Sequence, residues 1–420
     1  MREYDAFDPY KGNILIKGLG PIYSRAEVLR KLAVVPTKPT SQTVGKPHIA
    51  MHQMMVLLNL FLPDVEVLRL HSSIDIMLRQ SYLYRDPLKA STWSRLSGDH
   101  VAFASMDLRP HCGTVMGQSG TGKTFSIRRC LSAYPKMIHH ESFPKLIGGL
   151  KQVVSLSIDA PAGGGGSSLA AALMMGLDDI TGDGRFTKDL QKEWRDPEKM
   201  LATWLQVAKQ HYLGILHIDE IQNLFKLPTL QQRRKKKFDA EAPELSVQDD
   251  RALKWLLTLI NSGEIAVLIS GTPDGVSALA SRMATTERMV MSGFHNMRAF
   301  EDSKETRFRR NFLDQLGQYQ YVGKRLPVDD ELASLIVELT GGIQRIVMTI
   351  WIMAHRVAFE RDKGDLLLSD FKTAASTYLA PLQPAIAALR SQDPLRMAKY
   401  EDLLPRNKDF WRLLWQDAFN

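Results

Sequence analysis

The chain has 420 residues, of which 44% are hydrophobic and 24% charged, a composition that excludes a largely disordered protein and leaves room for two or three packed units. Its net charge of +8 suits a polyanionic partner without naming one. The two cysteines, Cys112 and Cys130, are too few for a disulfide framework or an unaided zinc site, and they favour a reducing compartment. The most apolar run, residues 54–62, is too short to span a bilayer, and the N-terminus lacks a signal-peptide core. We therefore expect a cytoplasmic protein with no membrane partner.

Residues 1–95 differ from the rest of the chain in their sequence pattern, because prolines divide them into short segments. A helix is predicted to start at Ser24, where Glu27 completes the spacing of a capping box, and a second helical stretch starts at His48. An amphipathic helix is predicted within residues 71–87, followed by the pair Tyr84-Arg85. This last segment has two interpretations of equal weight, a wall for a nucleotide base and a helix that joins two domains.

Residues 113–124 form the strongest motif, a short apolar run that breaks into glycine and ends on lysine and threonine. The pattern predicts a strand, a phosphate-binding loop and the start of a helix. Glycines let consecutive backbone N–H groups face a polyphosphate, and the following helix presents its positive end to the same charge. The lysine is expected to reach the β- and γ-phosphates of ATP and the threonine hydroxyl to bind Mg²⁺. The loop residues are Gly117, Gln118, Ser119, Gly120, Thr121, Gly122, Lys123 and Thr124.

Two further strands are predicted downstream, at residues 153–158 and 214–218. A glycine-rich loop at residues 159–168 follows the first of them. The second strand delivers Asp219 and Glu220, and two carboxylates after a phosphate loop are what hydrolysis requires. Asp219 can hold Mg²⁺ through water, and Glu220 can orient and polarise the attacking water. His217, inside the strand, is expected to be a packed residue and not a ligand.

A run of five cations after this strand cannot be buried and predicts an exposed loop. The loop either remains solvated or contacts the phosphate backbone of double-stranded DNA. Because no aromatic residues are interleaved with the cations, the run does not favour stacking on single-stranded bases. The five candidate DNA-binding residues are Arg233, Arg234, Lys235, Lys236 and Lys237.

A fourth strand is predicted at residues 265–269, and it ends at Ser270 and Thr272. Either hydroxyl can contact the γ-phosphate or the attacking water, although a turn-capping function is the alternative. A fifth strand is predicted at residues 319–323, preceded by Arg307 and Arg310. An arginine at such a position can complete the active site of a neighbouring subunit by stabilising charge on the transferred phosphoryl group.

From about Leu326 the pattern is helical, with helices predicted at residues 329–339, at about 344–361 and at 369–379. Arg345 lies in the first turn of the second helix, where a cation opposes the helix dipole, so an external anion such as the γ-phosphate is the expected partner. The tail at residues 381–420 carries Trp411 and Trp415, which either dock on a partner or fold back on the chain.

With the phosphate loop, the LHIDE and SGTP strand ends, the arginines before the fifth strand and the GGIQR helix start, residues 100–375 resemble an AAA+ ATPase. The resemblance implies an α/β P-loop NTPase fold, with a parallel five-stranded sheet of order 5-1-4-3-2, a helical lid and an active site shared between subunits. ATP and Mg²⁺ are the implied cofactors, and ATP hydrolysis to ADP and phosphate is the implied activity. The resemblance assigns Lys123 and Thr124 to Walker A, Asp219 and Glu220 to Walker B, Thr272 or Ser270 to sensor 1, Arg345 to sensor 2, and Arg307 or Arg310 to the arginine finger.

A narrower resemblance, to the TnsC/TniB group of transposition ATPases, is carried by four segments, SIDIMLRQSYLYRDP, LLTLINSGEIAVLISGTPDG, ETRFRRNF and TGGIQRIVMTIW. Members of that group form ATP-dependent rings or filaments on double-stranded target DNA, receive a target-selection protein (TniQ/TnsD-like) and recruit the transposase, with hydrolysis as an assembly switch. The chain departs from the group by its basic loop and its longer N-terminal module. The alternatives are a replication-initiator or clamp-loader-like AAA+ ATPase and an oligomerising signalling NTPase.

These expectations divide the chain into four parts. Residues 1–95 are predicted to form an N-terminal partner-binding module and residues 96–325 the AAA+ α/β nucleotide-binding domain. Residues 326–379 are predicted to form the helical lid, and residues 380–420 a C-terminal helical tail.

Overall fold

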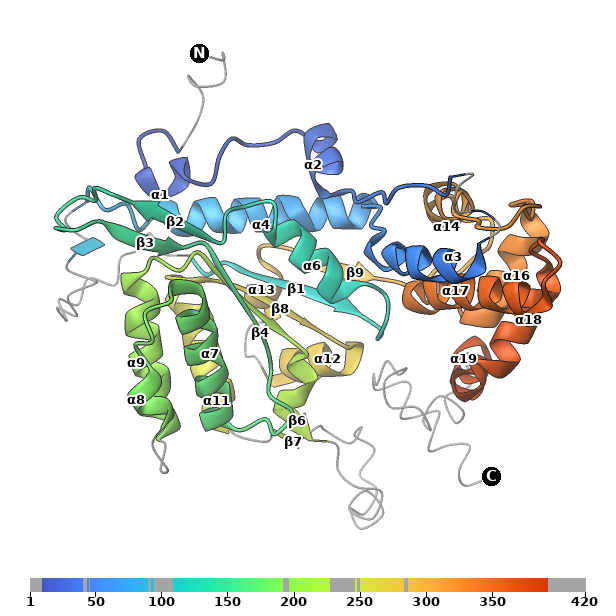
Figure 1. The fold of residues 1–420 in the computed structure, drawn as a ribbon. Helices are drawn as coiled ribbons and strands as arrows, with labels where there is room; N and C mark the ends of the chain where they lie inside the picture. The colour runs from blue at the N-terminus through green and yellow to red at the C-terminus, as the bar shows by residue number, and fades with distance from the viewer. Residues whose placement is uncertain are drawn as a thin grey trace, which may run out of the picture. The chain divides into compact units, whose positions relative to one another are not determined.

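The structure is a computed structural model that describes residues 10–40, 44, 46–89, 92–93, 109–191, 196–226, 246–247, 250–282 and 286–391 (Figure 1). The chain divides into two compact units. Unit 1 comprises residues 1–24, 69–116 and 127–295, and unit 2 comprises residues 25–68, 117–126 and 296–420. The N-terminal 95 residues are thus shared between both units.

The main sheet has five strands in the order β4-β5-β8-β1-β9. The strands are β1 (Cys112–Gly117), β4 (Ser155–Asp159), β5 (Ile215–Asp219), β8 (Ala266–Gly271) and β9 (Phe294–Met297). The pairs β1/β8, β4/β5 and β5/β8 are parallel. Every residue of β5 and β8 is buried, which is why both read as continuous apolar runs. Numbered along the chain, these strands have the order 5-1-4-3-2, so the predicted fold class is confirmed.

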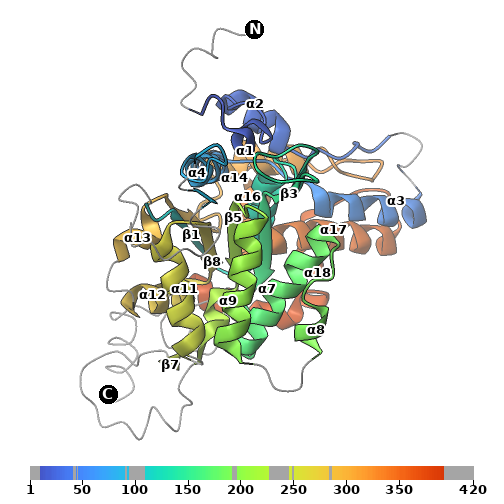
Figure 2. The ribbon, with the colours of Figure 1, turned by 90° about the vertical axis from the view of Figure 1, so that its left-hand side faces the viewer.

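Helices α7 (Gly166–Thr181), α9 (Pro197–Gln210) and α11 (Asp250–Ser262) pack together in unit 1, and Figures 1 and 2 show them side by side. Their apolar faces form one core with the sheet, in which Trp204 and Leu256 are completely buried. Helix α9 begins at Pro197, directly after Asp196. There Asp196 caps the helix by accepting a hydrogen bond of 3.0 Å from the Glu198 N–H, and Pro197 occupies the first turn.

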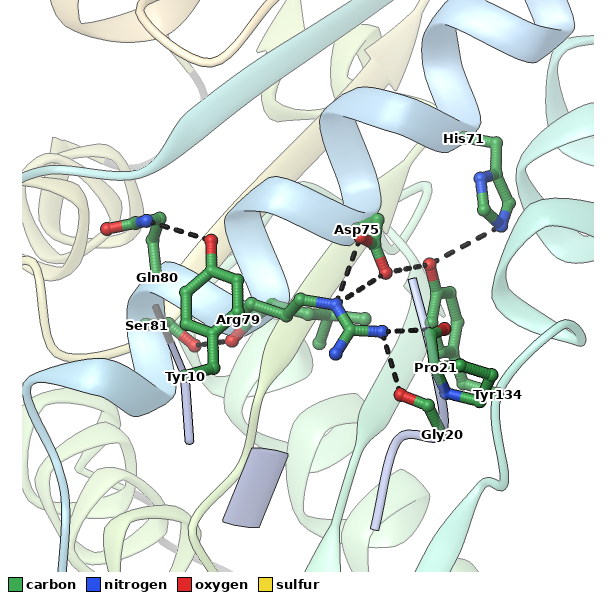
Figure 3. Close-up of polar contacts among 10 residues, drawn as sticks. Tyr10, Gly20, Pro21, His71, Asp75, Arg79, Gln80, Ser81 and Tyr134 are labelled. Atoms are coloured by element: carbon green, nitrogen blue, oxygen red, sulfur yellow. Dashed lines mark hydrogen bonds and ion pairs between the residues drawn. The ribbon is translucent and has the colours of Figure 1, made fainter. Parts of the chain in front are cut away.

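The long helix α4 (Val65–Leu83) anchors the N-terminal segment of unit 1 (Figure 3). The buried Arg79 pairs with Asp75 at 3.0 Å and donates to the carbonyls of Gly20 and Pro21, at 3.0 and 3.1 Å. Asp75 also accepts a hydrogen bond of 2.8 Å from the Tyr134 hydroxyl. Because these buried charges are paired and hydrogen-bonded, they hold residues 20–21 against α4 at little desolvation cost.

Both cysteines, Cys112 and Cys130, are buried and free. Burial raises the pKa of both thiols, that of Cys112 to about 12.

The remaining elements of unit 1 are shorter. These elements are α1 (Ile14–Lys17), the antiparallel pair β2 (Met137–His140) and β3 (Leu150–Val153), α8 (Thr187–Leu190), a 3₁₀ turn (Ile221–Leu224), the pair β6 (Phe225–Lys226) and β7 (Ser246–Val247), α12 (Pro273–Arg282) and α13 (Thr286–Val290). Helix α6 (Lys123–Leu131) begins in unit 2 and ends in unit 1.

Unit 2 is helical, and the helices predicted after residue 326 are confirmed. They are α16 (Asp330–Thr340), α17 (Gln344–Arg361) and α18 (Leu368–Thr377), and α19 (Gln383–Ser391) follows them in the predicted C-terminal tail. Trp351 of α17 is completely buried in their core, and α3 (Pro47–Met54) packs against α17 (Figure 1). The other elements of this unit are α2 (Arg25–Leu32), a 3₁₀ helix (Met55–Asn59), α14 (Thr306–Phe308), a π-helical turn (Arg309–Leu313), α15 (Asp314–Leu316) and a 3₁₀ turn (Ala380–Leu382).

The predicted position of the fifth strand is wrong. Residues 319–323 form no strand, and the fifth strand is β9. Tyr319, Tyr321 and Val322 are buried in the helical core of unit 2. The buried Gln320 amide between them donates to the carbonyls of Gly317 and Leu326, at 3.1 and 2.8 Å. The true strand escaped recognition because it is short and contains the polar residues His295 and Asn296.

Among the described residues, no single helix is long and apolar enough to cross a membrane; α16 and α17 reach that length and hydropathy only as a pair, across a bend of 114°.

Candidate functional site

The phosphate loop follows β1 and belongs to unit 2. Two of its glycines are required by the backbone, since Gly120 and Gly122 have φ values of 84° and 91°. Gly117 is required by space instead, because a Cβ atom there would lie 2.4 Å from the Met297 carbonyl oxygen. Lys123 is buried, and its ammonium donates a hydrogen bond of 3.1 Å to the Gln118 carbonyl. The lysine thus lies folded over its own loop.

Arg345 reaches this loop from the start of α17, in the same unit. Its backbone N–H donates to the Gly120 carbonyl at 3.1 Å, and its guanidinium donates to the Ser119 hydroxyl at 3.2 Å. The preceding residue, Gln344, lies close to Gly122, because a Cβ atom on that glycine would be 3.0 Å from the Gln344 side-chain oxygen. The structure therefore brings together Ser119, Gly120 and Arg345, which the sequence had placed in two separate motifs.

A pocket within unit 2 adjoins the phosphate loop. Its polar lining comes from Asp64, Thr121, Ser126, Arg298, Arg307, Asn311 and Gln344. Its apolar lining comes from Phe61, Leu62, Val67, Met297, Phe300 and Phe312. These apolar residues come from three stretches of the chain and share no motif, so no sequence pattern indicates them.

The alternative base wall, Tyr84-Arg85, lies elsewhere. Arg85 is buried in unit 1, where it donates to the Ser81 carbonyl at 3.0 Å and to the Leu213 carbonyl at 2.8 Å. Leu213 precedes β5, so Arg85 lies at the amino end of that strand, whereas Asp219 lies at its carboxyl end. The structure therefore favours the second interpretation, in which this segment is structural.

In unit 1, β5 ends at Asp219, whose side chain is almost completely buried. Its Oδ1 atom accepts a hydrogen bond of 2.5 Å from the Ser270 hydroxyl and one of 2.9 Å from the Glu220 backbone N–H. Glu220 itself adopts the left-handed conformation, with φ 53° and ψ 43°, which is costly for a residue with a side chain. Such strain at a sharp turn after a buried strand is typical of functional sites.

Gln222 links two of the predicted catalytic residues. Its amide nitrogen donates to a Glu220 carboxylate oxygen, and its amide oxygen accepts a hydrogen bond of 3.2 Å from the Thr272 backbone N–H. One side chain thus positions both the predicted water-orienting carboxylate and the predicted sensor segment. The sequence carried no signal for this role, because Gln222 lies in the turn after β5 and belongs to none of the motifs.

His217 is buried, as expected, but both its ring nitrogens are hydrogen-bonded. Nε2 lies 2.7 Å from the Ser270 hydroxyl oxygen, and Nδ1 lies 2.7 Å from the Ser157 hydroxyl oxygen. Burial lowers the pKa of His217 to about 4, although the nearby Asp219 carboxylate opposes this shift. The ring is therefore neutral at physiological pH.

The two sensor candidates differ in what they contact. The Ser270 hydroxyl is occupied by His217 and Asp219. The Thr272 hydroxyl makes no hydrogen bond to any residue that the structure describes. Thr272 is thus the candidate with a side chain available to a ligand.

The two arginine-finger candidates, Arg307 and Arg310, also differ in whether their guanidinium groups are already bonded. Arg307 donates to Glu305 at 2.7 Å and to the carbonyls of Arg298 and Ala299, at 3.0 and 2.7 Å. Arg310 is exposed and has no ion pair or hydrogen bond within the described part of the chain.

Arg307 and Arg310 were expected to precede the fifth strand. That prediction is wrong, because the fifth strand is β9 and both arginines follow it. Arg288 in α13 precedes that strand, and it donates to the Asn261 side chain. The sequence pointed away from Arg288 only because the fifth strand was misplaced.

The donor chemistry fits Mg²⁺. Asp219 offers a carboxylate and Thr124 a hydroxyl, and a Mg²⁺ ion bound with substrate phosphates takes only one or two protein ligands. Among the described residues, no group of three or more histidine, cysteine, aspartate or glutamate side chains could hold a metal on its own. The predicted DNA-binding residues 233–237 lie outside the described residues, as do Trp411 and Trp415.

Comparison with known proteins finds a family match in the middle of the chain. Residues 107–279 match the family described as AAA domain. No curated protein matches the sequence. Solved structures do match, among them the Drosophila origin recognition complex bound to DNA, with 12% sequence identity, coverage of 97% of this chain and 85% of that chain, and a TM-score of 0.42. Together with the sheet order, the family match identifies residues 107–279 as an AAA domain with the α/β fold of P-loop NTPases.

Proposed function

We propose that this protein is an AAA+ ATPase that regulates transposition. In this proposal it assembles on double-stranded DNA when ATP is bound, receives a target-selection protein of the TniQ/TnsD type and recruits the transposase. The observation that carries the nucleotide part is the contact of Arg345 with Ser119 and Gly120 of the phosphate loop. The transposition part rests on the resemblance of residues 73–87, 256–275, 305–312 and 340–351 to the TnsC/TniB group.

Phosphate binding falls to unit 2. The loop N–H groups and the N-terminus of α6 attract a polyphosphate, and Lys123 exchanges its bond to the Gln118 carbonyl for the β- and γ-phosphates. Arg345 exchanges its bond to Ser119 for the γ-phosphate. Without that phosphate the guanidinium returns to the Ser119 hydroxyl, the contact that the structure shows.

Hydrolysis falls to the carboxyl ends of β5 and β8 in unit 1. Asp219 is the proposed Mg²⁺ ligand of this unit, and the ion would neutralise charge on the phosphates. Glu220 orients the attacking water and accepts its proton. Thr272 contacts the γ-phosphate or that water, and Gln222 holds Glu220 and the Thr272 backbone together.

The site is completed by an arginine of a neighbouring subunit, which makes assembly depend on bound ATP. Arg288 is our candidate because it precedes β9, which is where the resemblance places this residue. Arg310 is its rival because its guanidinium is exposed and unpaired among the described residues. Arg307 is disfavoured because its donors are occupied within unit 2. Head-to-tail contacts of this kind build rings or helical filaments.

DNA binding is assigned to the basic loop at residues 233–237. Contacts to the phosphate backbone do not depend on base sequence, which suits a regulator that has many possible targets. Target specificity would then come from the partner proteins, for which the N-terminal residues 1–95 are the proposed docking module.

The proposed function is tested by measuring the affinity of the full-length protein for a random-sequence duplex, with and without ATP, over a range of salt concentrations. We expect the wild type to bind only with ATP and with equal affinity for unrelated sequences. Lys123→Ala should abolish the ATP-dependent binding. Neutralising the five cations of residues 233–237 should weaken binding and flatten the salt dependence, by about 0.9 in the logarithmic slope for each DNA phosphate that the protein no longer neutralises.

Lys136→Ala is the matched control, because Lys136 is an exposed lysine outside the phosphate loop. An unchanged salt slope after neutralisation would reject the basic loop as the DNA-binding segment. Strong preference for one DNA sequence would instead favour a replication initiator, and indifference to DNA would favour a signalling NTPase.

A further inference from the structure

Four side chains in unit 1 form a continuous chain of hydrogen bonds that ends at Asp219. Ser157 on β4 contacts His217 on β5, His217 contacts Ser270 on β8, and Ser270 contacts Asp219 at the end of β5. Successive side chains of a strand alternate between faces, so His217 and Asp219, two residues apart, lie on the same face of the sheet. The strand register places Ser157 beside His217 on that face. The pairing of the strands thus brings these four hydrogen-bonded side chains together.

The direction of each hydrogen bond follows from the number of protons available. A metal-binding carboxylate only accepts, so the Ser270 hydroxyl must donate its single proton to Asp219. Ser270 then has only lone pairs to offer to His217, and His217 must present Nε2–H to it. The Ser157 hydroxyl meets the opposite ring nitrogen and fixes the orientation of the ring.

We propose that His217 is a positioning residue for Asp219: by donating to Ser270, it forces the Ser270 hydroxyl to point at the carboxylate that binds the metal. This inference rests on the proposed nucleotide site, in which Asp219 serves Mg²⁺. Without the imidazole donor, the Ser270 hydroxyl can rotate and donate elsewhere, and Asp219 loses a bond that limits its rotation. Outer residues that orient metal ligands in this way typically contribute 10–100-fold to metal affinity or activity.

The hydrogen bonds from Ser157 to Asp219 also distinguish the roles of Ser270 and Thr272, the two sensor 1 candidates that the sequence left open. Ser270 acts through Asp219 and is a positioning residue, whereas Thr272 keeps its hydroxyl for a ligand. His217, which resembles an ordinary packed residue in the sequence, becomes part of the same assembly because its two neighbours are serines rather than apolar side chains.

The test is a titration of the full-length protein with Mn²⁺ in the presence of a non-hydrolysable ATP analogue, with bound metal followed by electron paramagnetic resonance. We expect His217→Phe and Ser270→Ala each to raise the Mn²⁺ dissociation constant about tenfold or more. Their affinity for the analogue in the presence of EDTA should equal that of the wild type. His217→Gln retains an N–H donor and should restore part of the metal affinity. The double variant should bind Mn²⁺ no more weakly than Ser270→Ala, because His217 has nothing left to orient.

Two variants serve as matched controls, Ser81→Ala and His355→Phe. Both residues are completely or almost completely buried, and neither contacts Asp219. They should leave the Mn²⁺ dissociation constant unchanged. Ser270→Ala removes a single oxygen atom, so it keeps the test informative even where His217→Phe folds poorly.

Wild-type Mn²⁺ affinity in Ser270→Ala, or strictly additive effects in the double variant, would overturn the inference while leaving the nucleotide site standing. Failure of the wild type to bind either the analogue or Mn²⁺ would instead overturn the proposed function. The two failures are therefore distinguishable in one experiment.

Discussion

At the scale of single residues, the site depends on side chains held by neighbours whose positioning role no motif indicates. Gln222 bonds to Glu220 and to the Thr272 backbone, and Ser270 bonds to Asp219. A motif identifies the group that meets the substrate because chemistry restricts its type. The residues that orient this group are selected by local geometry, which only the folded chain reveals.

The arginine that completes the site in a neighbouring subunit can be identified by complementation. We expect Arg288→Ala to lower ATP hydrolysis about a thousandfold, because the charge of the transferred phosphoryl loses a compensating cation. Glu220→Gln should also be inactive. Mixing the two inactive proteins should restore part of the activity, since an intact Glu220 of one subunit then faces an intact Arg288 of another.

Arg310→Ala is the control for this measurement, because it removes an exposed arginine that follows β9. Activity abolished in Arg310→Ala and restored by mixing with Glu220→Gln would transfer the role to Arg310. Activity retained in Arg288→Ala would reject our assignment.

At the scale of elements, α17 combines two functions: its first turn contacts the phosphate loop, and its centre forms the core of unit 2. His355 lies in that centre, where its Nδ1–H donates to the Trp351 carbonyl at 2.8 Å and its Nε2 has no hydrogen-bond partner among the described residues. Burial lowers the pKa of His355 to about 4, against the opposing effect of the Asp370 carboxylate. The aromatic rings of Tyr321, Trp351 and Phe359 surround it.

This histidine makes stability depend on pH. Because its pKa is lower in the folded state than the ordinary value of 6.5, the unfolded chain binds the additional proton between pH 6.5 and about 4. The contribution to stability is thus complete above pH 6.5 and is lost as the pH falls toward 4. Between pH 7.5 and pH 5 we expect a loss of about 2 kcal/mol in the free energy of unfolding from His355 alone.

Urea unfolding of the wild type and His355→Phe at several pH values measures this loss. The variant should show a flatter dependence by about 2 kcal/mol over the same range. Replacing the exposed His52 by glutamine is the control and should leave the dependence unchanged. Parallel curves for the wild type and His355→Phe would contradict a neutral buried histidine.

How far the sequence predicts an element depends on how many residues of that element share one environment. Strands β5 and β8 are buried throughout, so their apolar runs were recognised and the sheet order followed from the resemblance. Strand β9 has four residues with mixed burial, and its pattern was too weak to detect. The glycines of the phosphate loop were predictable because φ and close packing allow no other residue. The pocket around Phe61 and Phe300 was not, because distant segments form it.

At the scale of the whole molecule, the chain divides into two compact units, and the residues proposed for one reaction are divided between them. The phosphate loop and Arg345 belong to unit 2, whereas Asp219, Glu220 and Thr272 belong to unit 1. In the proposed function, the net charge of +8 would supply a general attraction to DNA.

The central claim is ATP-dependent assembly on DNA, and electron microscopy of the purified protein tests it most directly. We would image wild-type protein with a non-hydrolysable ATP analogue, and Glu220→Gln with ATP, each with and without a random-sequence duplex. We predict rings or filaments threaded by the duplex in both samples, none without nucleotide, and longer-lived assemblies for Glu220→Gln than for the wild type with ATP. Particles that assemble equally well without DNA and leave the duplex free would contradict the claim.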